Sequence, residues 1–302
     1  MIERLMSRLD RWQRAHRPAA FGYGVVKKFG DDRGSSHAAL ISYYGFFSLF
    51  PLLMVLFTVL GYVLGGNVEL QQRVQESALS RIPLLNSVDI AEVHGSGIAL
   101  AVGVLAALWA GLGATQVAQD AMNQVFDSPD AEAPNFVVKR LRSLATLGVI
   151  GIGILASTAV GTLGSALERI GILGQIGLAV ATLAVNVVVI VGLFRVLTVS
   201  PPALRSLATG AVVGAVGWTL LQYIGGWYVG HLVQQASRTY GVFAVVIGLL
   251  SWIFLQARIF LYAAEVASVV ELDLWPRGLV AGDPTPADEQ ALQRLVAASV
   301  RV

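Results

Sequence analysis

The sequence contains no cysteine. Disulfide bonds, thiolate nucleophiles and sulfur-ligated zinc sites are therefore excluded. Histidine is scarce as well, and the four histidines are scattered without metal-ligand spacing, at His16, His37, His94 and His231. The GxxxxGK pattern of a phosphate loop is absent too. We therefore expect no catalytic residue, no metal and no cofactor.

Charged residues are scarce as well. Of 302 residues only 13% are charged and 55% are hydrophobic, with a mean hydropathy of +0.68. Soluble domains carry about 25% charged residues. The apolar segments are also too long for the alternating strands of an outer-membrane barrel. The composition predicts an all-α integral membrane protein.

The hydrophobic segments predict six membrane-spanning helices, at roughly 38–64, 97–119, 141–167, 172–199, 204–229 and 240–270. The second continues as a polar helix to about residue 126. Pro51 lies near the middle of the first span, where a proline removes a backbone hydrogen bond, so we expect a kinked helix.

The predicted organisation has three parts. Residues 1–33 form a cytoplasmic amphipathic segment, residues 34–275 form the transmembrane domain, and residues 276–302 form a cytoplasmic tail with a short helix. A further set of short helices is expected in the polar connector 65–96.

The N-terminal segment places Leu5, Leu9 and Trp12 on one side of a helix, with arginines over the rest. This pattern is typical of a helix lying on an anionic lipid surface. A solvated helix packed on the protein itself fits equally well. Nucleic-acid binding is not indicated, because cytoplasmic segments of membrane proteins are routinely rich in arginine.

The distribution of basic residues predicts the orientation. Most of the 21 Lys and Arg residues precede the first span, follow the last, or occupy alternate connections. The opposite connections hold only Arg73, Arg81, Arg169 and Arg238. The positive-inside rule then predicts a multi-pass protein of a bacterial inner membrane, with both termini in the cytoplasm.

Small residues recur every fourth position on three spans and predict close helix packing. They are Gly103, Ala107 and Gly111 on the second span, Gly153, Ser157, Gly161 and Ser165 on the third, and Gly210 and Gly214 on the fifth.

The last span carries Arg258 and Glu265, seven positions apart and therefore on nearly one face. Such charges are costly when they face lipid, so this face should contact protein or a wet cavity. The residues are about 10.5 Å apart along the axis, which favours a separate partner for each. The orientation places further polar residues at the same depth, namely Tyr43, Tyr44, Ser48, Gln116, Gln119, Asn123 and Arg195. Internal bracing is an equally good interpretation, and Arg195 can simply extend to the interface.

Three stretches resemble the YihY/BrkB family of bacterial inner-membrane proteins. They are AALISYYGFFSLFPLL (38–53), ALWAGLGATQVAQDAMNQVF (107–126), and YGVFAVVIGLLSWIFL with YAAEVASVVE in the last span. The resemblance covers roughly residues 20–272. Glu265 matches the family pattern, whereas Arg258 stands where an apolar residue is usual. The older family label of ribonuclease BN is not supported by these residues, because the histidines are scattered.

The leading hypothesis is a transporter-like protein whose polar, cytoplasm-facing cavity binds an anionic amphiphile, a lipid head group or a small anion. Two arginines against one carboxylate favour an anion there. One alternative is a proton-coupled cation antiporter with Glu265 as the carrier. The other is an envelope assembly or scaffold protein, in which small-residue stripes bind partner helices. Membrane lipids are expected partners, and a homo-oligomer is compatible with those stripes.

Overall fold

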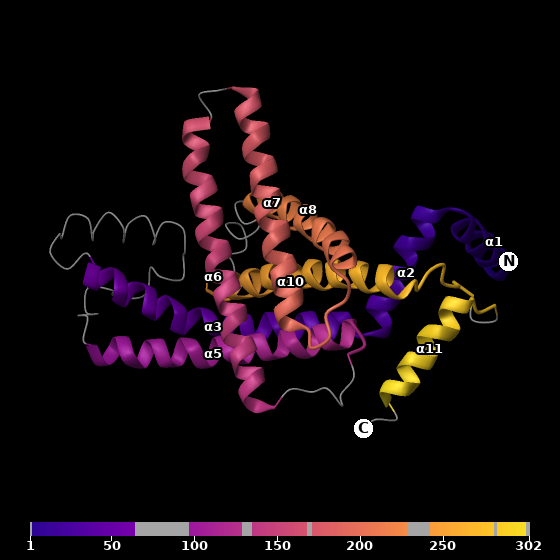
Figure 1. Ribbon diagram of the computed structural model, residues 1–302, viewed down its shortest axis with the longest axis horizontal. Coiled ribbons are helices and arrows are strands. Elements are labelled where there is room, and N and C mark those ends of the chain that lie inside the picture. The colour runs from indigo at the N-terminus through magenta and orange to yellow at the C-terminus, as the bar shows by residue number, and fades with distance from the viewer. Residues whose placement is uncertain are drawn as a thin grey trace. The chain divides into compact units, whose positions relative to one another are not determined.

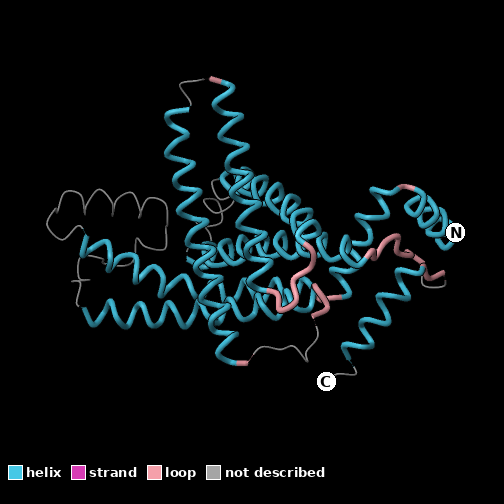
Figure 2. The backbone as a smooth tube through the Cα atoms, in the orientation of Figure 1, coloured by secondary structure: helices cyan, strands magenta, loops and turns pink. Residues whose placement is uncertain are grey.

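The computed structural model describes residues 2–63, 97–128, 135–167, 171–228, 242–280 and 283–299. Every regular element in these ranges is a helix (Figures 1 and 2). The helices are α1 (Ile2–Ala15), α2 (Arg17–Asp31), α3 (Gly34–Val63), α5 (Gly97–Val125), α6 (Phe136–Leu167), α7 (Ile172–Leu197), α8 (Leu204–Tyr228), α10 (Val242–Leu272) and α11 (Pro286–Ser299).

Five of these helices contain segments long and apolar enough to cross a membrane. The segments are Ala101–Val125, Phe136–Thr162, Ile172–Leu197, Leu204–Gln222 and Val246–Leu272. Large apolar side chains stay exposed along them, including Trp109 at 76%, Leu155 at 72% and Val188 at 70%. Lipid contact explains such exposure, because water would penalise it. The all-α membrane class is confirmed.

The first predicted span lies in α3, which continues as a helix through Pro51. The side chains beyond residue 52 are outside the described residues, so a sixth span stays a prediction. The connector 65–96 also lies outside the described residues. The N-terminal segment forms two helices, because the backbone at His16 is extended, with φ −111° and ψ 102°.

The chain divides into two compact units. The first unit contains residues 1–38, 115–221 and 256–302, and the second contains residues 39–114 and 222–255. Both terminal segments therefore belong to the first unit, together with α6, α7 and the second half of α10. Each unit is described by itself below.

Glycines allow helices of the first unit to approach closely. A Cβ added at Gly214 of α8 would come within 2.7 Å of the Ala263 Cβ of α10, and one at Gly210 would overlap the Ala263 carbonyl oxygen. A Cβ at Gly153 of α6 would meet Val189 of α7 at 2.8 Å. These three positions pack as the spacing predicts.

The rest of the α6 stripe differs from the prediction. Ser157 is exposed, and Gly161 has no neighbour within 4 Å among the described residues. The Ser165 side chain lies outside the described residues. On α5, Gly103 is buried while Ala107 and Gly111 are half-buried. Within the described part of α6, the four-residue spacing therefore produces close packing only at Gly153.

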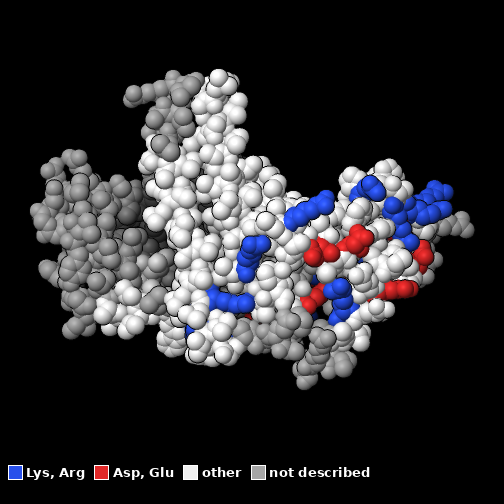
Figure 3. All heavy atoms as spheres, in the orientation of Figure 1, with Lys and Arg blue, Asp and Glu red and all other residues white. Residues whose placement is uncertain are grey.

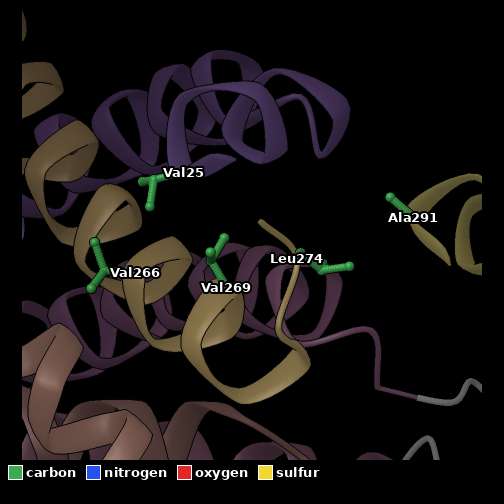
Figure 4. Packing of buried hydrophobic residues seen from close by; sticks show 5 residues of the cluster. All are labelled: Val25, Val266, Val269, Leu274 and Ala291. Atoms are coloured by element: carbon green, nitrogen blue, oxygen red, sulfur yellow. The ribbon is translucent and has the colours of Figure 1, made fainter. Parts of the chain in front are cut away.

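A hydrophobic cluster fastens the terminal helices to the end of α10. Val25 of α2 faces Val266 and Val269 of α10, with Leu274 just beyond the helix and Ala291 of α11 completing the cluster (Figure 4). Burying a valine or leucine side chain stabilises by roughly 1.5–3 kcal/mol. This cluster holds α2 against the last two turns of α10.

In the second unit, α3 and α10 are joined by a side-chain hydrogen bond. The Ser42 hydroxyl donates to the Leu250 carbonyl at 3.4 Å. Gly225 of α8 lies directly against the Trp252 ring, so any larger residue would overlap the indole. Aromatic residues Tyr43, Phe47 and Phe50 follow one another along α3 with ring centroids 4.8 and 6.4 Å apart.

Candidate functional site: a buried cluster of two acids and one lysine

Glu265 is fully buried on α10, with 0% of its surface exposed. Its carboxylate lies 3.5 Å from the Lys28 ammonium of α2. Neither carboxylate oxygen accepts a hydrogen bond from the described residues. A buried carboxylate ordinarily has such donors, because leaving it without them is costly. Glu265 is therefore poised to take a proton or a cation.

Lys28 connects three helices. Its ammonium donates to Asp32 in a very short ion pair and to the Val125 carbonyl at 2.8 Å. Val125 is the last residue of α5, and the carbonyls of a last turn have no partner within their helix. The Ser268 hydroxyl of α10 donates to the same carbonyl at 2.7 Å. The end of α5 is thus tied to α2 and α10 beside Glu265.

The end of α2 explains why Asp32 meets Lys28. The two residues are four apart, which places them on one helical face. The Asp32 amide donates to the Lys28 carbonyl at 2.9 Å, and Arg33 then takes a left-handed conformation with φ 53°. The chain turns there into α3, leaving the Asp32 carboxylate directed at the ammonium.

The cluster of Lys28, Asp32 and Glu265 has one more acid than base. Burial raises the pKa of Asp32, and the neighbouring Lys28 opposes the rise without cancelling it. Burial alone would lower the pKa of Lys28, but Glu265 and Asp32 outweigh it, so the pKa of Lys28 is raised. Lys28 stays charged, and a proton or a cation is needed for neutrality.

A small cleft on the first unit borders two members of this cluster, Lys28 and Asp32, but not Glu265. Its lining residues are Lys28, Asp31, Asp32, Asp127, Leu274, Arg277, Ala291, Arg294 and Leu295. Arg294 pairs with Asp127 across 3.5 Å, and both are partly exposed. Lys28 and Asp32 thus face Glu265 on one side and the cleft on the other.

A second ion-pair network, the terminal network, flanks the cleft. Asp288 of α11 accepts from Lys27 at 2.7 Å and from Arg277 at 2.7 Å, while Arg277 also pairs with Asp31 at 2.8 Å. Burial would raise the pKa of Asp288, but these bonds and the amides of Thr285 and Gly278 lower it strongly. Figure 3 shows the charged side chains gathered near α1, α2 and α11 and few over α6 and α7.

The remaining predicted residues are distributed differently. The Gln119 amide donates to Ser143 at 2.9 Å, and the Asn123 side-chain oxygen accepts from the Val199 amide at 2.8 Å. The first bond joins α5 to α6 and the second joins α5 to the segment just after α7, as a brace would. Gln116 is half-buried and Arg195 is exposed in the last turn of α7.

Arg258 has two aromatic neighbours. Its guanidinium lies over the rings of Phe29 and Tyr262, at 5.7 and 5.8 Å from their centroids. That Arg258 and Glu265 have separate partners stays a prediction. Tyr43 and Tyr44 are exposed, and the Ser48 hydroxyl donates to the Gly45 carbonyl at 2.7 Å; all three belong to the second unit.

Sequence reasoning missed Lys28 and Asp32. They lie in the segment interpreted as a surface helix, yet KKFGDD offers a lysine and an aspartate at i and i+4 beside apolar residues. That spacing was the available signal. Among the described residues, no group of three or more His, Asp or Glu could hold a metal ion.

The apolar helices and the charged cluster define a multi-pass helical membrane protein. Residues 25–281 match the family profile described as Virulence factor BrkB. The chain belongs to this family, the YihY/BrkB family, as the sequence resemblance indicates.

Several relatives align over most of the chain. The inner membrane protein YhjD of Escherichia coli (strain K12) is 24% identical over 84% of this chain and 81% of its own length. A ribonuclease-like protein, YfkH, of Bacillus subtilis (strain 168) is 25% identical over 78% of this chain and 90% of its own. A UPF0761 membrane protein of Psychrobacter sp. (strain PRwf-1) is 23% identical over 84% of this chain and 49% of its own. No solved structure matches the chain.

Proposed function

We propose that this protein is a transporter-like protein of the bacterial inner membrane that exchanges protons for a monovalent cation at Glu265. The observation that carries the proposal is the excess of buried acid: Asp32 and Glu265 share one ammonium, that of Lys28. Intramembrane carboxylates of this kind mark proton relays and ion paths.

The coupling follows from electroneutrality. With Lys28 charged and both acids ionised, the cluster carries one net negative charge in a dry setting, which is costly. A proton on Glu265 removes that charge, and so does a cation bound beside it. Either a proton or a cation is enough to neutralise the cluster, so the two compete for the same place. Release of the proton therefore favours binding of the cation, and this competition is what exchange requires. In this proposal the ions enter from the side of the cleft that Lys28 and Asp32 line.

The test is proton movement in vesicles reconstituted with the whole chain. A pH-sensitive dye inside the vesicles should report proton movement on addition of sodium or potassium. Glu265→Gln should abolish the response, while Glu289→Gln, the same change on exposed α11, should leave it intact. A response that survives in correctly inserted Glu265→Gln protein refutes the proposal.

An anionic ligand is the second candidate, and Arg277 favours it. Arg277 lines the cleft, only 3% of it is exposed, and its Nη1 makes no hydrogen bond with the described residues. A phosphate or carboxylate in the cleft could accept from it. Inorganic phosphate should then raise the thermal unfolding midpoint of the wild type. The cleft variant Arg294→Gln should reduce that shift, and the exposed Arg205→Gln should not.

The scaffold hypothesis predicts neither result. If the wild-type protein shows no proton response and no stabilisation by phosphate, an assembly role is favoured.

The cytoplasmic location of both termini is part of the proposal, since it places the cleft on the cytoplasmic side. Modification of a single cysteine introduced on exposed α11, by a reagent that does not cross membranes, tests it.

A further inference from the structure

Helix α1 is attached to the first unit by polar side chains. Asp10 and Gln13 are buried, with 2% and 5% of their surfaces exposed. The Asp10 carboxylate accepts from the Leu279 amide at 2.8 Å, and the Gln13 side chain donates to the Arg277 carbonyl at 2.6 Å. Arg14 donates to the Asp283 carboxylate at 3.0 Å and to its carbonyl at 2.7 Å. The attachment surface of α1 is therefore hydrophilic.

The apolar side chains Leu9 and Trp12 of α1 lie outside this attachment face. They are 51% and 57% exposed, whereas Met6, four residues before Asp10, lies on the attachment side. An amphipathic helix that serves only the protein's own core does the opposite and buries its apolar stripe. Among the residues that the structure describes, packing within the first unit thus leaves Leu9 and Trp12 exposed.

Basic residues border the exposed apolar side chains. Arg8, Arg11 and Arg17 are exposed on or just after the same helix. Arginines beside an exposed apolar stripe match the two layers of an anionic bilayer surface, with head groups above acyl chains. The charge is complementary to anionic phospholipid, whereas a soluble apolar partner would gain nothing from the arginines.

The fold also places α1 close to the bilayer boundary. Only His16 separates α1 from α2. Helix α2 packs on the last turns of the span Val246–Leu272 through Val25, and Gly24 approaches the Leu274 carbonyl so closely that a Cβ would lie at 3.1 Å. The end of α1 is therefore separated by about nine residues, roughly 14 Å of helix, from the part of α2 that contacts the end of the span.

We propose that α1 lies in the plane of the membrane, with Leu9 and Trp12 inserted among the head groups of anionic phospholipids. Its polar side stays bound to Arg277, Leu279 and Asp283, and Arg277 also belongs to the terminal network. The helix is thus a lipid-facing anchor for the cytoplasmic end of the first unit, independent of any transport activity.

The absence of cysteine allows a direct test with site-directed spin labels. Leu9→Cys and, as a matched control on exposed α11, Gln293→Cys are each labelled in the full chain and placed in nanodiscs of phosphatidylglycerol and phosphatidylethanolamine. Relaxation by oxygen, which concentrates in lipid, is compared with relaxation by a water-soluble nickel complex. We expect several-fold higher relative oxygen accessibility at position 9 than at position 293.

Two results would overturn the proposal. Equal nickel accessibility at positions 9 and 293 would mean that α1 faces water. Loss of accessibility to both reagents at position 9, with spin–spin broadening, would mean that a second copy covers the helix. Arg8→Gln with Arg11→Gln supports the role of anionic lipid if it lowers the oxygen accessibility at position 9, and contradicts it if the value is unchanged.

Discussion

Replacement of Lys28 by methionine removes the positive charge that lies between the two buried acids, Asp32 and Glu265. Methionine keeps most of the length of the side chain, so the change is mainly electrostatic. The side chains of Lys28 and Asp32 are each 4% exposed and that of Glu265 is 0% exposed. Solvent therefore cannot replace the lost ammonium. The Val125 carbonyl also loses its Lys28 donor, although Ser268 still donates to it.

The expected loss of stability is large for a single substitution. Removing one member of a buried ion pair typically costs about 3–5 kcal/mol, because the partner is left charged and unpaired. The double variant Lys28→Met with Glu265→Gln removes an acid together with the base, and should recover a large part of that loss. Contacting residues generally couple by about 0.5–3 kcal/mol in such cycles.

The loss should depend on pH, with a sign that follows from Asp32. Its folded-state pKa lies above the unfolded value of about 3.9. Its contribution is therefore full below about pH 3.9 and is lost as pH rises through the folded pKa. Without Lys28 the pKa of Asp32 rises further, so the variant should be less impaired at acidic pH than at neutral pH.

The assay is unfolding of detergent-solubilised protein by sodium dodecyl sulfate, followed by tryptophan fluorescence. Lys139→Met, at a half-buried position on α6, is the control and should change the free energy by about 0.5 kcal/mol or less. The reasoning is refuted if Lys28→Met unfolds within about 1 kcal/mol of the wild type at neutral pH. It is also refuted if the free energy lost in the double variant equals the sum of the losses in Lys28→Met and Glu265→Gln measured separately.

Three further predictions follow from other parts of the first unit. Gly210→Ala should destabilise the protein by about 1–3 kcal/mol, because the added Cβ would overlap the Ala263 carbonyl oxygen. Gly148→Ala, where the added Cβ would meet no described atom within 4 Å, should not destabilise it. Denaturant titration of both variants separates the effect of packing from that of helix propensity. Asp288→Asn should lower the thermal unfolding midpoint at neutral pH. Because the pKa of Asp288 is depressed in the folded state, its carboxylate stabilises the fold above about pH 3.9, and this stabilisation is lost as the pH falls. The midpoints of wild type and variant should therefore converge in acid. Gln119→Leu should cost about 1–3 kcal/mol by leaving the buried Ser143 hydroxyl without its donor, and the loss should shrink in the double variant with Ser143→Ala; an unchanged loss would contradict the brace.

Hydropathy predicted the helices well because each span must satisfy its own backbone in lipid, a local requirement. The predicted 172–199 and 204–229 correspond to α7 and α8 within two residues at each end. The start of the third span was less accurate: α6 begins at Phe136, since the basic residues that follow it are still helical.

The partners within the site could not be predicted in the same way. Spacing on one helix indicated that Glu265 needs a partner, but it carries no information about a lysine from the other end of the chain. Arg258 was grouped with Glu265 by their spacing on one helix face and by depth, whereas its guanidinium lies over two aromatic rings. The direction in which α1 faces depends on the contacts of Asp10 with Leu279 and of Gln13 with Arg277, which no local pattern reveals.

The most direct measurement of the central claim is the infrared difference spectrum of the protein in lipid, recorded on addition of sodium or potassium. The account predicts that a protonated carboxyl band decreases as the cation enters, that this change is missing in Glu265→Gln, and that it persists in Glu289→Gln. A spectrum in which no carboxyl band responds to either cation, or in which Glu265→Gln responds like the wild type, would contradict it.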